Sequence, residues 1–281
     1  MLPRKLLVFD LETIPDTALG RAVHHDWAEL EDIAVRAKLS AAMLEKTQMK
    51  SDFLPPIYHQ VVCISCLMAD IEYHDGTESY HFRKLWSVGE AGDDEATILR
   101  QFLHGAGKEP YRLVSYNGLG FDLLTLRFRA LKHGLSAPWL FGWKDKWKNH
   151  FTKSSPEFHE DLADLFGVRG VKLDELCKLV GLPGKMDVAG QWVADLMADG
   201  QTDTVRNYCE TDILNTYLLY LHYKQLTGAL APDARQHAES TVVDMLVQQA
   251  EHKPHLAAFL TCWQPGGPAE ISHNNKELPN A

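Results

Sequence analysis

The alternation of apolar and polar residues predicts four strands in the first half of the chain. An apolar run at 6–9 (LLVF) is typical of a buried strand, which we expect to cover residues 5–12 and to end at Pro15. Further strands are predicted at 60–69, 78–86 and 112–117, with a turn at 73–76 (YHDG).

Apolar residues three and four positions apart predict helices in the rest of the chain. One or two are expected within 20–50, and others at 93–107, 121–134, 172–182, 202–228, 232–250 and 254–263. In the helix at 121–134, Leu124, Phe128 and Leu131 have the spacing of core positions. A short strand or helix begins within 154–167. Strands before and between helices indicate an α/β fold built on a mixed sheet.

Composition narrows the class of protein. The 281 residues are 45% hydrophobic and carry a net charge of −10, which argues against nonspecific coating of nucleic acid but allows an enzyme with a local basic groove. No run approaches the roughly 18 apolar residues of a membrane span, so we expect a cytoplasmic protein without a membrane partner. The five cysteines are scattered, and Cys63 and Cys66 would point to opposite faces of one strand, which favours core thiols over a metal or redox site.

Two carboxylates interrupt the first apolar strand. Asp10 and Glu12 are two residues apart, so both side chains project to the same side. Burying two such charges without a partner would cost several kcal/mol, whereas a divalent cation would neutralise them. The alternative is a strand that simply ends in water with both acids solvated.

Two later segments supply further acids. Asp122 follows a strand and a glycine loop and stands at the start of a helix, where it could serve a site or only cap the helix. Tyr208 and Asp212 are four residues apart on a long helix and lie beside its core-facing stripe. An inward aspartate needs a partner or a metal, and an inward tyrosine is often a packing residue.

Together these segments resemble the DEDD superfamily of 3′–5′ exonucleases, in the branch that carries tyrosine (DEDDy). The matching motifs are 9–13 (FDLET), 116–122 (YNGLGFD) and 208–212 (YCETD). Residues 181–193 (GLPGKMDVAGQWV) add a likeness to bacterial predicted exonucleases related to the proofreading domain of family B DNA polymerases. The related branch has histidine five residues before its last aspartate, where Asn207 stands here.

The resemblance implies a ribonuclease H-like fold over roughly residues 4–227 and a hydrolytic mechanism. Asp10, Glu12 and Asp212 would hold one divalent cation, and Asp10 and Asp122 a second, either Mg²⁺ or Mn²⁺. The Tyr208 hydroxyl would orient the attacking water, and nucleoside 5′-monophosphates would leave from a single-stranded 3′ end. Kinship with family B polymerases favours DNA over RNA and allows a polymerase or repair partner in trans.

An exonuclease must also hold the terminal nucleotides. Candidate contacts are the Thr13 backbone, Asn117, the ring of Phe121 and the ammonium of Lys185. Residues 127–153 carry seven Lys or Arg and one acid, interleaved with Trp139, Trp143 and Trp147, which suits a single-strand track. The alternative is a solvated helix whose tryptophans anchor a loop.

Three segments are expected: an exonuclease domain at 1–228, a helical extension packed on it at 229–263, and a disordered Pro/Gly/Asn-rich tail at 264–281. Two other functions stay open. A haloacid dehalogenase-type phosphatase also has an acidic motif after its first strand, with Asp10 as nucleophile, although its second aspartate would be Glu12 here. A catalytically silent nucleic-acid-binding module could retain the same fold.

Overall fold

A five-stranded mixed sheet forms the centre of the computed structural model, which describes residues 2–142, 149–150, 157–167, 170–186 and 190–263. The strands are β1 (Lys5–Pro15), β2 (His59–His74), β3 (Thr77–Val88), β4 (Tyr111–Ser115) and β5 (His159–Asp161). Their order is β3-β2-β1-β4-β5. The β2 strand is antiparallel to both of its neighbours, whereas β1, β4 and β5 run parallel.

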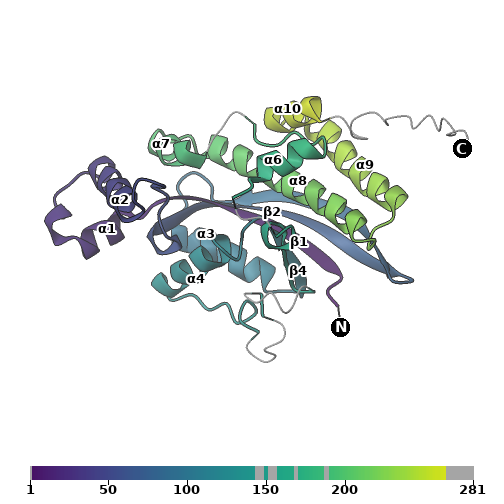
Figure 1. Cartoon of the computed structure of the whole chain (residues 1–281), viewed down its shortest axis with the longest axis horizontal. Helices are drawn as coiled ribbons and strands as arrows, with labels where there is room; N and C mark the ends of the chain where they lie inside the picture. Colours follow the sequence, from purple (N-terminus) through teal and green to yellow (C-terminus); the bar gives the residue numbers. More distant parts are fainter. Residues whose placement is uncertain (1, 143–148, 151–156, 168–169, 187–189, 264–281) are drawn as a thin grey trace, which may run out of the picture.

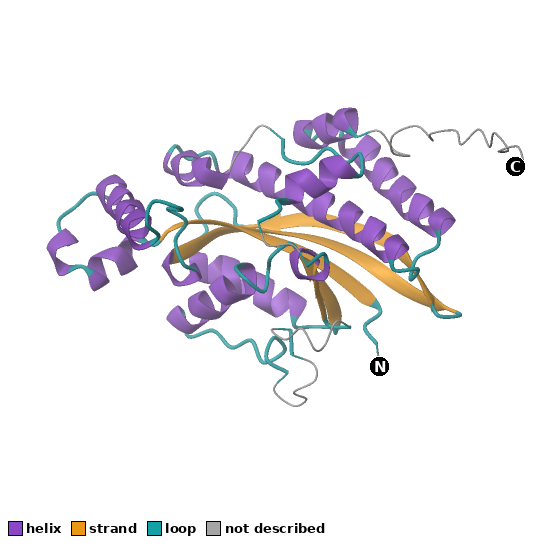
Figure 2. Cartoon of the chain, in the orientation of Figure 1, coloured by secondary structure: helices purple, strands orange, loops and turns teal. Residues whose placement is uncertain are grey.

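Helices cover both faces of the sheet (Figures 1 and 2). On one face lie α8 (Thr202–Leu226), α9 (Pro232–Gln249) and α10 (Pro254–Cys262), and on the other α3 (Glu95–Ala106) and α4 (Asp122–Lys132). Two helices beyond one end of the sheet, α1 (Thr17–Val23) and α2 (Asp32–Lys46), enclose a small core of their own. The short helices are α5 (Leu162–Leu165), α6 (Leu173–Leu179) and α7 (Val193–Ala198). This architecture confirms the predicted α/β, ribonuclease H-like fold class with additional C-terminal helices.

The alternation of side chains along β1 decides where its carboxylates point. Leu6 and Val8 pack in the core beneath α8, whereas Leu7, Phe9 and Leu11 pack against α3 and α4. Asp10 and Glu12 share the parity of Leu6 and Val8, so they face α8. The predicted strand is confirmed, and it extends to Pro15.

The predicted core face of α4 is wrong. Leu123, Leu126 and Ala130 are buried, whereas Leu131 is 79% exposed. An apolar stripe exists on either side of this helix, so periodicity alone does not choose between them. The choice depends on Asp122, whose side chain turns inward to β1 and sets the rotation of the helix.

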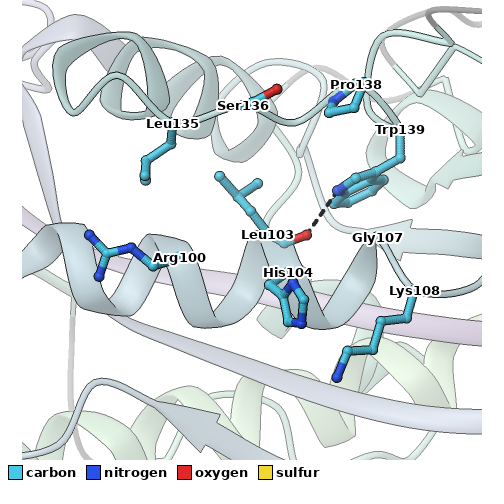
Figure 3. Close-up of a pocket in the computed structure, with 9 residues that line it drawn as sticks. All are labelled: Arg100, Leu103, His104, Gly107, Lys108, Leu135, Ser136, Pro138 and Trp139. Atoms are coloured by element: carbon cyan, nitrogen blue, oxygen red, sulfur yellow. Dashed lines mark hydrogen bonds between the residues drawn. The ribbon is translucent and has the colours of Figure 1, made fainter.

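Part of the predicted basic track is also wrong. Arg129 is only 2% exposed and is ion-paired with Asp16 and Glu95, and Lys132 lies 2.9 Å from Asp16. Figure 3 shows the Trp139 indole donating to the Leu103 carbonyl, beside a cavity of about 460 Å³. Trp139 therefore anchors a loop, as the alternative interpretation expected, whereas Arg129 is buried and not solvated. Trp143, Trp147 and the four lysines at 144, 146, 148 and 153 lie outside the described residues.

The two cysteines of the CxxC sequence pack in different cores, Cys66 under α3 and Cys63 beside α8, as predicted from strand geometry. Within the described residues, no helix has the length and apolar character needed to cross a bilayer. The predicted tail at 264–281 lies outside the described residues.

Candidate active site

Three elements bring the four candidate carboxylates together near the middle of β1, where Asp122 and Asp212 are charged neighbours of Asp10. Strand β1 supplies Asp10 and Glu12, the first turn of α4 supplies Asp122, and α8 supplies Asp212. Asp122 does not cap its own helix, because its Oδ1 accepts a hydrogen bond from the Leu11 backbone N–H at 3.2 Å. The parallel pairing of β1 with β4 explains this contact, since the chain after β4 enters α4 next to the middle of β1.

The site is electrostatically crowded. Burial, followed by the charges of Asp122 and Asp212, raises the pKa of Asp10 well above its ordinary value. Burial, Asp10 and Asp212 likewise raise the pKa of Glu12. Mainly because it is buried, Asp122 has a pKa raised to about 7. Holding these buried carboxylates close together therefore costs folding free energy, which a bound cation would offset.

The arrangement fits a divalent cation. Asp212 is only 6% exposed, and its Oδ1 has no hydrogen-bond partner among the described residues, although buried carboxylate oxygens are normally paired. Ligand atoms of Asp10, Glu12 and Cys209 lie within 4.8 Å of one another. Carboxylate oxygens are the ligands that Mg²⁺ and Mn²⁺ prefer.

Lys185 brings a positive charge into direct contact with these acids. Its ammonium donates a hydrogen bond to the Tyr208 hydroxyl at 2.6 Å and lies 3.7 Å from Oδ2 of Asp212. Burial and the neighbouring carboxylates raise the pKa of Tyr208, so the phenol stays protonated. Its oxygen accepts from Lys185, and a hydrogen bond also links the phenol to the Asp212 carboxylate.

The segment that carries Lys185 is tied to α8 and α6. The Asn215 amide donates to the Gly184 carbonyl at 2.7 Å and accepts from the Gly184 N–H at 3.1 Å. Oδ1 of Asp174 accepts from the Lys185 backbone N–H at 2.8 Å. Lys185 therefore reaches the site from an anchored backbone and not from a free surface loop.

The glycine loop before Asp122 has an unusual conformation. Asn117 adopts a left-handed backbone with φ of 65°, and its carbonyl accepts from the N–H groups of Gly120 and Phe121. A Cβ at Gly120 would lie 2.5 Å from Oδ1 of Asn117, so any other residue there would displace the Asn117 side chain. Asp161 accepts from the backbone N–H groups of Asn117 and Leu119 at 2.7 and 2.8 Å.

Asp161 is a residue that sequence reasoning missed. It lies at the end of a three-residue strand, 44 positions from Asn117, and nothing in its local sequence distinguishes it from an ordinary cap for α5. The one sequence signal that could have pointed to Asp161 is an acidic residue in a strand, as with Asp10.

The remaining candidate substrate contacts lie on the α4 side of the acids. The Thr13 hydroxyl is hydrogen-bonded to Nδ1 of His59 at 2.8 Å, just after a bulge between Glu12 and Thr13. The half-buried ring of Phe121 packs edge-on against the same imidazole, with ring centroids 4.8 Å apart.

Comparisons with known proteins identify the family of this chain. Residues 51–263 match a family described as predicted 3′–5′ exonucleases related to the exonuclease domain of PolB. That range includes Asp122, Tyr208 and Asp212, whereas Asp10 and Glu12 precede it. The chain is also 24% identical, over 204 residues, to the catalytic subunit of DNA polymerase epsilon from Dictyostelium discoideum.

The alignment with the polymerase epsilon subunit covers 69% of this chain and 8% of that polymerase. A solved family B DNA polymerase from the hyperthermophilic archaeon Pyrobaculum calidifontis aligns with a TM-score of 0.45 and 16% identity, over 89% of this chain and 29% of that one. The chain thus spans a minor part of both relatives. Because the family match covers most of its length, this protein belongs to the predicted 3′–5′ exonucleases related to the exonuclease domain of PolB.

Proposed function

We propose that the chain is an active, metal-dependent 3′–5′ exonuclease that hydrolyses the terminal phosphodiester of single-stranded nucleic acid, with DNA as the favoured substrate. The main support for this proposal is the buried Oδ1 of Asp212, which lacks a hydrogen-bond partner among the described residues and lies beside Asp10 and Glu12. Without a cation, such a group of buried carboxylates would only destabilise the fold. The family membership supports the same reaction.

In this proposal Asp10, Glu12, Asp122 and Asp212 hold two Mg²⁺ or Mn²⁺ ions. When bound, such ions activate a water at neutral pH and stabilise charge on the attacking and leaving oxygens. The protonated Tyr208 hydroxyl, which is hydrogen-bonded to Asp212 in the structure, would orient the attacking water. Lys185 holds that hydroxyl and places a positive charge where the scissile phosphate must lie.

The geometry gives less support to the two alternatives. A phosphatase nucleophile must approach phosphorus with one carboxylate free, whereas Asp10 is crowded by Asp122 and Asp212. A silent binding module would not need the retained carboxylates and Tyr208. We further propose residues 1–228 as the exonuclease domain, 229–263 as an extension packed on it, and a polymerase or repair enzyme as a partner in trans.

The direct test offers 5′-labelled single-stranded DNA, duplex DNA and RNA with Mn²⁺. A ladder that shortens one nucleotide at a time from the 3′ end is expected, fastest on single-stranded DNA. Asp212→Ala and Asp10→Ala proteins should remain folded and produce no ladder. A fully active Asp212→Ala protein would refute the proposal, and a phosphoryl group trapped on Asp10 would favour the phosphatase.

A further inference from the structure

The 208–212 motif contains a second acid, Glu210, which the proposed metal site does not use. Positions two apart on an α-helix differ by about 200° around its axis, so Glu210 points away from both Tyr208 and Asp212. Its side chain is nevertheless buried, with only 4% of the residue exposed. A buried carboxylate on this side of α8 needs partners of its own.

Helix α10, which lies next to α8 (Figure 1), supplies two basic partners for Glu210. Nζ of Lys253 donates to both carboxylate oxygens, at 3.1 and 2.9 Å, and Nε2 of His255 donates to Oε2 at 2.9 Å. Burial opposes the charge on Glu210, but the hydrogen bonds from His255 and Lys253 outweigh it and lower its pKa, in contrast to the proposed metal ligands. Glu210 is therefore a stable anion that needs no metal ion.

The same carboxylate also reaches the sheet. Its Oε1 accepts from the Ser87 hydroxyl on β3 at 3.2 Å, and the hydroxyls of Ser87 and Ser65 are hydrogen-bonded at 2.7 Å. Ser65 lies on β2 directly opposite Asp10 of β1, so these two side chains are neighbours on one face of the sheet. A continuous row of polar contacts thus runs from α10 through Glu210 to the strand beside Asp10.

This row of contacts holds α8 in place relative to the sheet. Asp10 belongs to the sheet and Asp212 to α8, so a rotation or shift of α8 changes the distance between the two carboxylates. A bound Mg²⁺ requires near-ideal geometry, and a functional site tolerates errors of only about 0.5 Å in the positions of its side chains. A small displacement of α8 would therefore impair a shared cation site.

We propose that Glu210 is a positioning residue for the metal site, held in place by Lys253 and His255, and that α10 is thereby part of the catalytic unit. This inference rests on the proposed exonuclease function, and it gives the C-terminal helices a role beyond packing. Loss of the contacts to Glu210 should weaken Mn²⁺ binding and lower kcat. KM for the strand should change little, because Glu210 points away from the site.

The test compares Glu210→Gln with a matched variant, Glu239→Gln. Glu239 is 5% exposed, accepts from Arg235 and lies 3.4 Å from Nε2 of His222, so it has the same kinds of partner near the other end of α8. Both substitutions should lower the melting temperature. Only Glu210→Gln should weaken Mn²⁺ binding to the protein alone, measured by calorimetry, by about 10- to 100-fold, with a similar fall in kcat.

Lys253 separates the effect of charge from that of packing. Lys253→Met should lower Mn²⁺ affinity and kcat in the same direction as Glu210→Gln, whereas Lys253→Arg keeps the cation and should restore both toward the wild-type values. If Glu210→Gln binds Mn²⁺ and hydrolyses DNA as well as Glu239→Gln does, the positioning proposal is wrong and the exonuclease proposal stands.

A second measurement requires neither metal nor turnover. Amide hydrogen exchange at residues 208–212 of the metal-free protein should be about 10- to 100-fold faster in Glu210→Gln than in Glu239→Gln, because only the former loses its contacts to this part of α8. Faster exchange confined to Glu210→Gln would support the inference even if the wild-type protein hydrolysed nothing. Equal exchange in the two variants would overturn it independently of any result on hydrolysis.

Discussion

Tyr208 accepts a 2.6 Å hydrogen bond from the ammonium of Lys185, 23 positions earlier in the chain. The same ammonium lies 3.7 Å from Asp212 and 5.2 Å from the centroid of the Tyr208 ring. One lysine thus contacts both candidate positions of the 208–212 motif. In the proposed reaction it fixes the direction in which the phenol can donate.

Lys185→Met should lower kcat by roughly 10- to 100-fold, because a hydrogen bond to a charged group contributes about 1.5–3 kcal/mol. Since Lys185 acts through Tyr208, the Lys185→Met/Tyr208→Phe double variant should lose little more than Tyr208→Phe alone. Single-turnover rates of the three variants measure this coupling. Losses that multiply fully would show that the lysine works independently, as a phosphate contact only.

Removal of metal should destabilise the protein. With four carboxylates crowded and no cation, like charges oppose folding, whereas saturating Mn²⁺ at 100 times its Kd would stabilise by about 2.7 kcal/mol. Thermal unfolding with Mn²⁺ or with EDTA should show this gap for the wild type. Asp10→Asn should raise the melting temperature in EDTA and narrow the gap. An unchanged response to Mn²⁺ in that variant would contradict the assignment of Asp10 as a ligand.

Asp161→Ala should impair catalysis, although Asp161 is not one of the proposed metal ligands. The backbone N–H groups of Asn117 and Leu119 would lose their acceptor, at a cost of about 0.5–1.5 kcal/mol for each hydrogen bond, since both are only partly buried. The loop that presents Asp122 would loosen, so we expect at least a tenfold fall in kcat and weaker Mn²⁺ activation. Asp161→Asn keeps one acceptor oxygen, so its kcat should lie between those of the wild type and Asp161→Ala. A destabilised protein with wild-type kcat would limit Asp161 to a folding role.

Two buried histidines should make the fold acid-sensitive. Burial lowers the pKa of both His150 and His159 to about 4, from an ordinary value near 6.5. Between these values the unfolded chain binds protons that the folded chain excludes, so their stabilisation is present above pH 6.5 and is lost as the pH falls toward 4. His159 is held neutral because its Nδ1 donates to the His150 carbonyl and its Nε2 accepts from Ser115.

His159→Gln should therefore flatten the loss of unfolding free energy between pH 6.5 and 4. Urea unfolding of both proteins at several pH values measures the difference, in which the site carboxylates largely cancel because both proteins share them. A parallel pH dependence in the two proteins would exclude His159 as a cause.

Arg129→Met should cost about 3–5 kcal/mol, since it removes the buried cation that Asp16 and Glu95 share and leaves them only Lys132 and His133 as partners. Burial disfavours the charge on Asp16, but hydrogen bonds from Lys132 and Arg129 outweigh it and lower its pKa to about 2. The loss should appear in thermal unfolding and not in the affinity for DNA. A stable Arg129→Met protein that binds DNA weakly would restore the track interpretation.

How far the sequence predicts this molecule depends on the range of the interactions involved. The inward direction of Asp10 and Glu12 follows from strand alternation, and the spacing of Tyr208 and Asp212 follows from one turn of helix, so local rules suffice for both. Arg129 instead pairs with a carboxylate 113 positions away, and a local interpretation took it for a solvent-exposed cation. The rotation of α4 likewise depends on a contact between Asp122 and another element.

The residues that only the structure identifies also act through contacts with residues distant in the sequence. Asp161 holds a loop 44 positions earlier, and Glu210 is held by Lys253, 43 positions later. No periodicity marks either of them. Motif spacing identified the acids because their chemistry requires fixed residue types, whereas supporting residues are identified by what they touch.

The two-sided packing of β1 has a consequence for how this gene can vary. Deleting or inserting a single codon between Lys5 and Asp10 would exchange the two faces of the strand. The acids would then turn toward α3 and α4, and leucines would occupy the positions where we propose that the ions bind. A substitution between Lys5 and Asp10 changes one side chain and leaves the others in place. A one-codon insertion or deletion shifts every following side chain of the strand, so we expect it not to be tolerated.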